Sequence, residues 1–382
     1  MAKHSLDRKI IIVSGTRADY GKLKPIIKEL INHNNKYDCR IFVTGMHLLR
    51  KYGSTFKECE KDFPFLVDKF INQNEGDSME VVLGKTILGF SDYVSENQPD
   101  LIIVHGDRVE ALACSIVGAL KNVLVAHIEG GEISGTIDES LRHAVTKMSH
   151  IHFVSNESAR TTLLQLGERN ENIHVIGSPE VDIFNSKDLP SIKDVKKRYN
   201  ITFDEFSILL YHSVTTEIDM IDKHTTILLD DLVDSKENFV VIYPNNDEGS
   251  DRIIRQYLSI KDNKNFHFLP SMRFEHFVSL IKNCKFMVGN SSSGVREAPF
   301  LGVPSINVGS RQNGRSFADS VFHTSFSKGL ILQTIKVLAN KKQYTNVAKD
   351  FGTGNSGQKF IDILSQDLFW EIDKQKYFMK NE

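Results

Sequence analysis

Short runs of apolar, β-branched residues recur along the chain, and each is followed by a segment whose apolar residues return at helical spacing. The runs are apolar at nearly every position, which is typical of parallel strands covered by helices on both faces. This alternation predicts right-handed βαβ units. The strands expected in the first half are Lys9–Val13, Cys39–Val43, Leu101–His105, Val123–His127, Ile151–Val154 and Ile173–Ile176.

A polar stretch without a strong strand, from about residue 182 to 204, interrupts the alternation once. Because 382 residues exceed what one core usually organises, we place a domain junction there. We expect an α/β protein of two Rossmann-like, doubly wound domains, 1–182 and 183–360, with a helical segment 361–382 that packs back on the first. The strands expected in the second half are Ser207–Tyr211, Val240–Tyr243, Phe266–Leu269, Phe286–Val288 and Ser305–Val308.

Charge and composition narrow the class of protein. Lys and Arg number 47 against 49 Asp and Glu, a formal charge of -2, so the chain has no long-range attraction for nucleic acid. The first residues lack the apolar run of a signal peptide, and no stretch approaches the length of a membrane span. We therefore expect a cytoplasmic protein. Its four cysteines lie far apart in sequence and are expected to be buried, reduced thiols.

Polar residues follow the carboxyl ends of the expected strands, where open parallel sheets bind ligands. The first strand leads into a glycine turn and Arg17, a pattern that suits an anion. Taken singly, each residue is compatible with a helix cap, a surface ion pair or a buried structural histidine. Their convergence on one edge favours chemistry instead. The other residues at these strand ends are His47, His105, Asp107, Arg108, His127 and Glu129.

Asp138 stands near the start of a later helix, where it could simply be a cap. If its loop folds over the same edge, Asp107, Glu129 and Asp138 form a carboxylate cluster. Repulsion in such a cluster raises the pKa of one member, so that acid and base roles become available together. A metal site is disfavoured, because no residues show the spacing of metal-binding motifs.

The second half carries an anion-binding pattern. His212 follows one strand, and another leads into Gly289–Glu297, a small-residue turn whose hydroxyls and helix amides suit phosphate. Glu297 could accept hydrogen bonds from a ribose, and Arg311 offers a forked cation. The pattern predicts that the second domain holds a nucleoside diphosphate while the first acts on the attached group.

Seven strings of the sequence, spread over nearly the whole chain, resemble the hydrolysing nucleotide-sugar 2-epimerases of sialic-acid-type biosynthesis. The resemblance implies a GT-B-like fold with the active site in the cleft between its domains, and conversion of UDP-N-acetylglucosamine to N-acetylmannosamine and UDP. The implied steps are elimination of UDP and hydration of a 2-acetamidoglucal, without a metal or redox cofactor, in a homodimer or homotetramer. The strings are Gly15–Tyr20, Thr44–His47, His105–Arg108, His127–Glu132, Ser134–His143, Tyr243–Asp247 and Gly289–Ser292.

The resemblance also assigns roles by motif position. The catalytic residues would be Asp107, Glu129, Asp138 and His212, with the identity of the C2 base left open. One departure stands out: Ser213 occupies a position where relatives usually have proline, so φ is less restricted beside His212 and turnover could be slower. The substrate-binding residues would be Arg17, Asp19, His47, His105, Arg108, His127, Asn246, Ser291, Ser292, Gly294, Glu297 and Arg311.

Other functions remain open at this point. Close relatives in legionaminic-acid pathways act on UDP- or GDP-linked N,N'-diacetylbacillosamine and share these motifs. A GT-B glycosyltransferase would bind the same donor, but it needs an acceptor groove rather than several carboxylates. A non-catalytic nucleotide-sugar sensor would not need Asp107, Glu129 and Asp138. A non-hydrolysing epimerase is disfavoured only by the local match at Gly135–Asp138.

Overall fold

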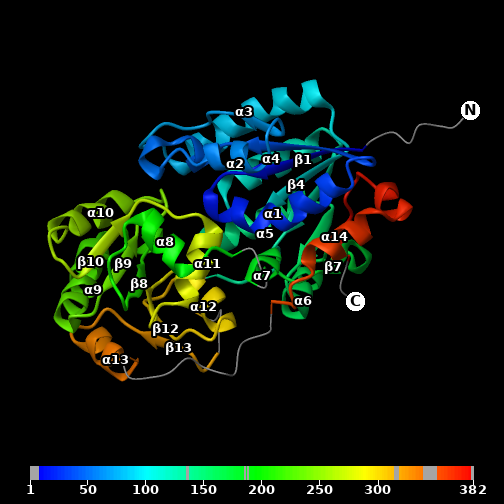
Figure 1. The fold of residues 1–382 in the computed structure, drawn as a ribbon. Helices are drawn as coiled ribbons and strands as arrows, with labels where there is room; N and C mark the ends of the chain where they lie inside the picture. Colours follow the sequence, from blue (N-terminus) through cyan, green and yellow to red (C-terminus); the bar gives the residue numbers. More distant parts are fainter. Residues whose placement is uncertain are drawn as a thin grey trace, which may run out of the picture. The chain divides into compact units, whose positions relative to one another are not determined.

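Each half of the chain folds around its own parallel β-sheet in the computed structural model (Figure 1). The structure describes residues 8–134, 137–184, 186, 189–313, 318–338 and 351–379. The contacts divide the chain into two compact units. Unit 1 comprises the described residues within Met1–Glu132, Asp138–Ser186 and Asp350–Glu382, and unit 2 those within Ile133–Ile137 and Lys187–Lys349. This is the expected fold class, two Rossmann-like α/β units.

Unit 1 contains, within its described part, a seven-stranded parallel sheet of order β3-β2-β1-β4-β5-β6-β7. Its first strands thus follow the doubly wound order, in which the chain starts at the centre and winds to both sides. The strands are β1 (Arg8–Ser14), β2 (Tyr37–Val43), β3 (Val67–Lys69), β4 (Leu101–His105), β5 (Leu124–Ile128), β6 (Ile151–Val154) and β7 (Ile173–Val175). The helices are α1 (Arg17–Asn32), α2 (Phe56–Asp62), α3 (Met79–Asn97), α4 (Val109–Leu120), α5 (Ile137–Met148), α6 (Glu157–Gln165), α7 (Pro179–Phe184) and α14 (Ser356–Leu364).

Both faces of this sheet are covered, and the sequence of β1 explains how. Successive strand residues point to opposite faces. Ile10 and Ile12 therefore join the core under α1 and α14, whereas Ile11 and Val13 join the core under α3 and α4. A strand buried on both sides must be apolar throughout, and this is the pattern that the chain shows.

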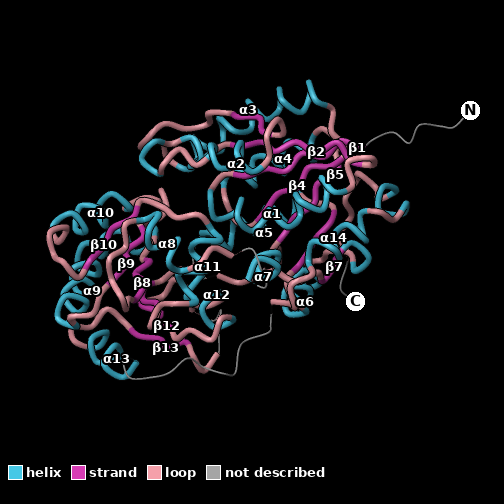
Figure 2. The backbone as a smooth tube through the Cα atoms, in the orientation of Figure 1, coloured by secondary structure: helices cyan, strands magenta, loops and turns pink. Residues whose placement is uncertain are grey.

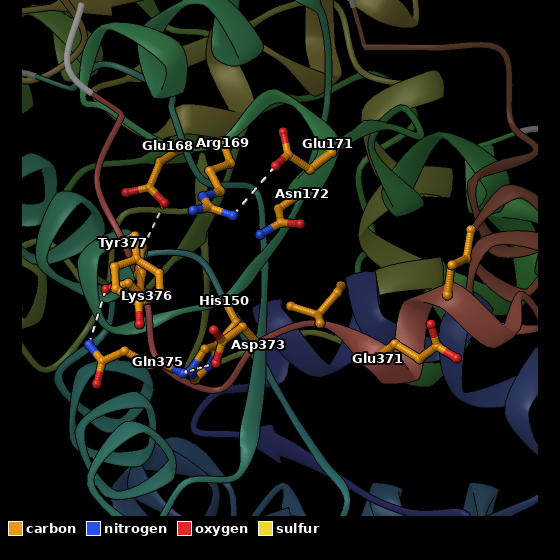
Figure 3. A pocket seen from close by; sticks show the side chains of 12 residues that line it. His150, Glu168, Arg169, Glu171, Asn172, Glu371, Asp373, Gln375, Lys376 and Tyr377 are labelled. Atoms are coloured by element: carbon orange, nitrogen blue, oxygen red, sulfur yellow. Dashed lines mark hydrogen bonds and ion pairs between the residues drawn. The ribbon is translucent and has the colours of Figure 1, made fainter.

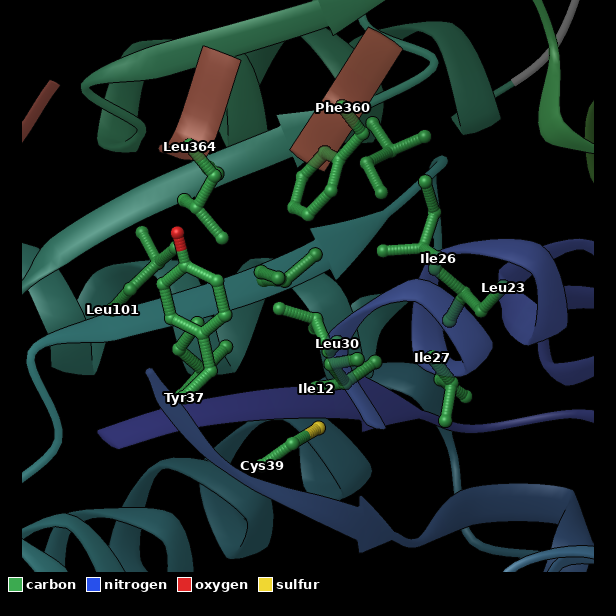
Figure 4. Packing of buried hydrophobic residues seen from close by; sticks show 14 of the residues in the cluster. Ile12, Leu23, Ile26, Ile27, Leu30, Tyr37, Cys39, Leu101, Phe360 and Leu364 are labelled. Carbon is green, nitrogen blue, oxygen red and sulfur yellow. The ribbon is translucent and has the colours of Figure 1, made fainter. Parts of the chain in front are cut away.

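The C-terminal segment completes the first of these cores (Figure 4). Phe360 and Leu364 of α14 are fully buried against side chains of α1, among them Ile26 and Leu30. Truncating Phe360 to alanine would cost about 3–5 kcal/mol by the usual scale for core aromatics. Residues 351–360 were expected in the second domain, but in the structure they belong to unit 1, because α14 packs on α1.

Unit 2 is built on a second parallel sheet (Figure 2). Among the described residues its strand order is β10-β9-β8-β11-β12-β13. Its strands are β8 (Ser207–Leu210), β9 (Phe239–Ile242), β10 (Phe266–Leu269), β11 (Met287–Gly289), β12 (Ser305–Val308) and β13 (Val321–Thr324). Its helices are α8 (Ile192–Tyr199), α9 (Ile221–Ser235), α10 (Ser250–Ser259), α11 (Phe274–Lys282), α12 (Glu297–Phe300) and α13 (Leu330–Leu338).

The eleven predicted strands are all present, most of them shifted by no more than one or two residues. Two further strands, β3 and β13, were missed. Each is short and partly exposed at the rim of its sheet, so neither carries the apolar run that marks the others. Among the helices of the described residues, none combines the length and apolar composition needed to cross a bilayer.

Candidate functional site

The carboxyl ends of β1, β2, β4 and β5 lie next to one another in unit 1, because these strands are neighbours in one parallel sheet. The turn after β1 is held together by Asp19. Its carboxylate accepts hydrogen bonds from the amides of Gly15 and Thr16 and from Ser14 Oγ, and it completes a capping box with Thr16 at the start of α1. Asp19 therefore fixes the shape of the glycine turn, and its contact with a ligand stays a prediction.

His47, also assigned to substrate binding, is fully buried beside this turn. Its Nε2 lies 3.0 Å from Ser14 Oγ and its Nδ1 lies 2.6 Å from Thr55 Oγ1. Burial lowers the pKa of His47 to about 4, so the ring is neutral at physiological pH. Arg17, at the first position of α1, forms an ion pair with Glu58 of α2. The structure thus gives both residues partners within the protein.

His127 holds the turn that precedes Asp107. Its ring is fully buried at the end of β5, where Nε2 donates to the carbonyl of Gly106 at 2.8 Å and Nδ1 lies 3.1 Å from Thr146 Oγ1. Burial lowers its pKa to about 3. A neutral histidine with both nitrogens occupied is a structural support. Here it supports the loop that carries Asp107.

Asp107 forms an ion pair with Arg142 of α5, a residue that the sequence analysis did not select. Arg142 is buried and also donates to the carbonyl of Glu132 at 3.0 Å. Asp138 lies in the first turn of α5, four residues before Arg142, and residues at this spacing share one helix face. Helix α5 therefore presents Asp138 on the side that holds Asp107.

Glu129 follows β5 and contacts two basic groups. Its Oε2 lies 3.3 Å from His105 Nε2 and 3.7 Å from Nζ of Lys22, while Oε1 accepts a hydrogen bond from Ser178. His105 ends the neighbouring strand β4, so this part of the predicted convergence is present. The sequence did not point to Lys22 or Ser178. Lys22 lies within α1, and Ser178 follows β7, away from the strand ends that were considered.

A further carboxyl group, Glu110, was missed at this edge. It is 1% exposed on α4, and Gly15 and Gly45 leave room for it: a methyl carbon added at Gly45 would lie 2.6 Å from Glu110 Oε1. Arg108 Nε lies 3.6 Å from Glu110 Oε2 and would lower the pKa of Glu110. The effect of burial is larger, so the pKa of Glu110 is raised. An acidic residue within the otherwise apolar helix VEALACSIVGAL is the signal that could have revealed it.

The edge of the unit 2 sheet carries His212. Its backbone is fixed by Asn290, whose Oδ1 accepts from the His212 amide at 2.7 Å and whose Nδ2 donates to the His212 carbonyl at 2.8 Å. The amide of Asn245 donates to the ring Nδ1 at 3.1 Å. In the neutral ring the hydrogen is therefore assigned to Nε2, which makes this atom a donor. Asn246 follows in the same loop, beyond the carboxyl end of β9.

The small-residue turn after β11 differs from the expected strand–helix junction. A short 3₁₀ turn over Ser292–Gly294 leads into α12, which has four residues and ends at Phe300 before Gly302 turns left-handed, with φ 71°. Ser291 accepts from the Ser293 amide, and Ser293 Oγ donates to Glu297 at 3.2 Å. Ser292 and Gly294 are half-exposed, so the turn itself, rather than a long helix, presents the polar groups.

Arg311 and Gln312 extend this arrangement from the end of β12. Both donate to the carbonyl of Asn290, at 3.3 and 3.0 Å, and both are buried. The predicted residues of unit 2 thus lie beyond the carboxyl ends of neighbouring strands. Asn290 connects them, and its role was not anticipated.

Unit 1 also contains a cavity of about 280 Å³, which is separate from the sheet edge described above (Figure 3). It is lined in part by His150, Asn172 and Lys376. His150 and Asn172 immediately precede β6 and β7, so the cavity lies at the amino ends of the strands, opposite the edge described above. Lys376 pairs with buried Glu168 at 2.6 Å, which ties the C-terminal segment down there.

The described residues offer no cluster suited to metal binding, and their cysteines are buried. Within the described part of the chain, we find no three His, Cys, Asp or Glu side chains placed to ligate one ion. All four cysteines are buried, and burial raises the pKa of each thiol, to about 12 for Cys39. These are the structural thiols that the sequence predicts.

Comparison with known proteins shows which family the chain resembles. The family model described as UDP-N-acetylglucosamine 2-epimerase matches residues 29–365. A UDP-N-acetylglucosamine 2-epimerase of Neisseria meningitidis serogroup B is 42% identical over 97% of this chain and 99% of its own length. A UDP-N,N'-diacetylbacillosamine 2-epimerase (hydrolyzing) of Legionella pneumophila is 34% identical over 94% of this chain and 95% of its own.

Solved structures agree in fold. The Methanocaldococcus jannaschii UDP-GlcNAc 2-epimerase, crystallised with UDP-GlcNAc and UDP, aligns with a TM-score of 0.77 at 22% identity over 94% of this chain and 99% of that one. This likeness extends the match from the sequence to the fold. The chain therefore belongs to the UDP-N-acetylglucosamine 2-epimerase family.

Proposed function

We propose that the protein is a hydrolysing epimerase that converts UDP-N-acetylglucosamine to N-acetylmannosamine and UDP. The observation that carries this proposal is the pairing of two strand-end carboxylates with basic side chains in unit 1, Asp107 with Arg142 and Glu129 with His105 and Lys22. In such pairs the carboxylates can accept and return protons, and the neighbouring cations stabilise their ionised form. The identity of 42% to a UDP-N-acetylglucosamine 2-epimerase supports the substrate.

The first step is an elimination. A carboxylate among Asp107, Glu129 and Asp138 accepts the C2 proton of the sugar, the electron pair of that bond forms the C1–C2 double bond, and the C1–O bond to UDP breaks. The products are 2-acetamidoglucal and UDP. Nearby cations favour the ionised form of the carboxylates, which the base must have to accept a proton.

The second step adds water across the double bond. The oxygen of water bonds to C1 and keeps one proton as the new hydroxyl group, a protonated side chain delivers a proton to C2 from the face opposite the one that lost it, and the second proton of water passes to the protein. N-Acetylmannosamine is the product. The group that delivers a proton to C2 is therefore not the one that removed it, both exchange protons with the solvent, and the proton released from water leaves with UDP or to the solvent.

Unit 2 would hold the UDP group. Ser291, Ser292, Gly294 and Arg311 offer polar groups for the diphosphate, and Glu297 offers a carboxylate for the ribose. His212 would stabilise the departing phosphate, because its Nε2 hydrogen makes it a donor there. The proposal requires the sugar to reach the carboxylates of unit 1 while unit 2 binds the nucleotide.

The hydrolysing course rests on the relatives. Proteins of Legionella pneumophila and Campylobacter jejuni that are described as hydrolyzing 2-epimerases are each 34% identical to this chain. Because both act, by their names, on diacetylbacillosamine nucleotides, the same reaction on UDP- or GDP-N,N'-diacetylbacillosamine is the second candidate. The first would serve sialic acid biosynthesis and the second legionaminic acid biosynthesis.

A proton NMR time course in deuterated water separates these outcomes. With UDP-N-acetylglucosamine we expect free UDP and N-acetylmannosamine deuterated at C2. Formation of UDP-N-acetylmannosamine without free UDP would replace the hydrolysing course by a non-hydrolysing one. Turnover only with a diacetylbacillosamine nucleotide would keep the reaction and change the substrate, and inactivity with all three would reject the proposal.

We further propose that the enzyme works in the cytoplasm as a homodimer or homotetramer, as the family resemblance implies. A cytoplasmic location fits a reaction on nucleotide-linked sugars. Light scattering coupled to size exclusion, with and without UDP, measures the mass directly. A mass equal to the 43.3 kDa chain under both conditions would reject the oligomer.

A further inference from the structure

The backbone of Glu129 adopts a conformation that side-chain-bearing residues avoid. Its φ is 63°, in the left-handed region, where a non-glycine residue costs about 1–2 kcal/mol. The Glu129 amide donates to the carbonyl of Phe153 at 3.0 Å, and the residue is 5% exposed. Surrounding structure must therefore hold Glu129 in place, and strain of this kind is concentrated at functional sites.

The two carboxylate oxygens of Glu129 have different surroundings. Oε1 accepts a 2.6 Å hydrogen bond from the hydroxyl of Ser178, which is itself fully buried. Oε2 instead lies 3.3 Å from His105 Nε2 and 3.7 Å from Lys22 Nζ. The Ser178 contact thus orients the carboxylate so that Oε2 is the oxygen directed at the basic groups.

Lys22 is shared between two carboxylates. Its Nζ lies 2.6 Å from Glu180 Oε2, closer than to Glu129, and Glu180 is 1% exposed. Part of the lysine charge is therefore balanced by Glu180. A short charge-assisted hydrogen bond from Ser178 becomes correspondingly more important for Glu129, since such bonds are among the stronger ones in proteins.

Ser178 is held in position by the C-terminal segment. Its amide donates to the carbonyl of Phe351 at 2.7 Å, and Asp182 accepts hydrogen bonds from the amides of Ser356 and Gly357 at the start of α14. A methyl carbon added at Gly352 would lie 2.9 Å from the Cα of Gly177. The loop that carries Ser178 thus has little freedom to move away from Glu129.

We propose that Ser178 is a positioning residue for Glu129: its hydroxyl fixes one carboxylate oxygen so that the other faces His105 and Lys22 in the ionised form. This inference rests on the proposed function, in which Glu129 is one of the proton-transfer groups. It assigns to the loop after β7 a part in the reaction that is exerted through Glu129.

The first test follows Glu129 directly and needs no substrate. The protein is labelled with ¹³C at the glutamate carboxyl, the Glu129 resonance is assigned with the Glu129→Gln variant, and its titration is compared in wild type and Ser178→Ala. We expect the pKa to rise by about one unit in the variant, the size of a lost hydrogen bond to a charged group. Ser178→Thr keeps the hydroxyl, so Glu129 should have the wild-type pKa in this variant.

The second test measures turnover. We expect Ser178→Ala to lower kcat by about tenfold or more with KM within twofold, and to move the acid limb of the kcat profile upward by the same shift as the titration. Ser178→Cys, nearly isosteric and a weak donor, serves if the alanine variant does not fold. Ser149→Ala, which removes a buried hydroxyl bonded to the Val145 carbonyl in the same unit, is the matched control and should leave kcat unchanged.

An unchanged Glu129 titration in Ser178→Ala would overturn the inference. Equal loss of activity in Ser178→Ala and Ser149→Ala, without a shift of the acid limb, would also overturn it by showing a general structural effect. An inactive wild type would reject the proposed function, whereas the titration would still decide the contact between Ser178 and Glu129. The two failures are therefore distinguishable.

Discussion

The guanidinium of Arg142 pairs with the carboxylate of Asp107, and only 4% of the Arg142 side chain is exposed whereas 27% of the Asp107 side chain is. The cation thus contacts the carboxylate from the protein interior, while part of the carboxylate stays accessible to solvent. Removing one partner of a buried ion pair leaves the other charge uncompensated.

Arg142→Gln should therefore lower kcat by about 10²-fold, a loss comparable to removing one electrostatic contact from an active site. UDP release measures the effect. Arg160→Gln, which breaks the more exposed pair with Glu157, is the control and should stay near wild type. An Arg142→Gln variant with normal kcat would show that Asp107 acts without this cation.

Acid should destabilise unit 1 through His47 and His127. Burial holds their folded pKa values at about 4 and about 3, below the unfolded value of 6.5. Stability is therefore fully present above about pH 6.5 and is lost as pH falls toward the folded pKa values, because the unfolded state takes up protons first. By pH 5 each histidine should cost about 2 kcal/mol.

Thermal unfolding at pH 7 and pH 5 tests this, with His47→Gln as the informative variant. The variant should be less stable at pH 7, because it loses the contacts with Ser14 and Thr55, yet its Tm should fall less between the two pH values. The exposed-side-chain variant Lys69→Gln should keep the wild-type pH dependence. An identical pH dependence in His47→Gln would contradict the explanation.

Glu110 should have the opposite dependence on pH. Burial raises its folded pKa, so the folded state binds a proton more tightly than the unfolded state, and stability falls as pH rises past the unfolded value of 4.5. Glu110→Gln is neutral at every pH and should raise Tm at pH 8 by about 2–4 °C, equivalent to about 1 kcal/mol in a domain of this size.

The gain in Tm from Glu110→Gln should become smaller as the pH falls toward 5. Differential scanning calorimetry measures it, and Glu171→Gln, whose side chain is 66% exposed, should change Tm little at either pH. A Glu110→Gln variant that is less stable at pH 8 would show instead that the carboxylate is ionised and needed by Arg108.

The position of His212 should depend on Asn290 more than on residue 213. Asn290 makes two hydrogen bonds to the His212 backbone, and Ser213 is buried beside it. Asn290→Ala should lower kcat by at least tenfold, since hydrogen bonds of this kind contribute about 1 kcal/mol each. Ser213→Pro should change kcat by less than about threefold. A large gain from Ser213→Pro would show that the missing proline does limit turnover.

The sequence predicts the fold well because parallel strands buried on both faces leave a continuous apolar run. It predicts the strand-end residues of the site for the same reason, since chain order alone brings His105 and Glu129 to neighbouring strands. The supporting residues were harder to find. Arg142, Ser178 and Asn290 reach the site from a helix or a distant loop, and only the packing reveals their partners.

Glu110 illustrates a different limit. Its position in an apolar helix is visible in the sequence, but whether its carboxyl is buried depends on two glycines at residues 15 and 45. The carboxylates of the expected cluster also have different neighbours from those predicted. In the structure Asp107 faces Arg142 and Glu129 faces Lys22, which a pattern of acidic residues along the chain could not indicate.

The return of the C-terminal segment sets the order in which the protein can fold during synthesis. Most of unit 1 precedes unit 2 in the chain, yet its core includes Phe360, Leu364 and Phe369, which leave the ribosome after unit 2. Almost all of unit 2 is contiguous and is synthesised in between. The second unit can therefore complete its core first, whereas part of the apolar surface of the first unit stays uncovered until α14 has been synthesised.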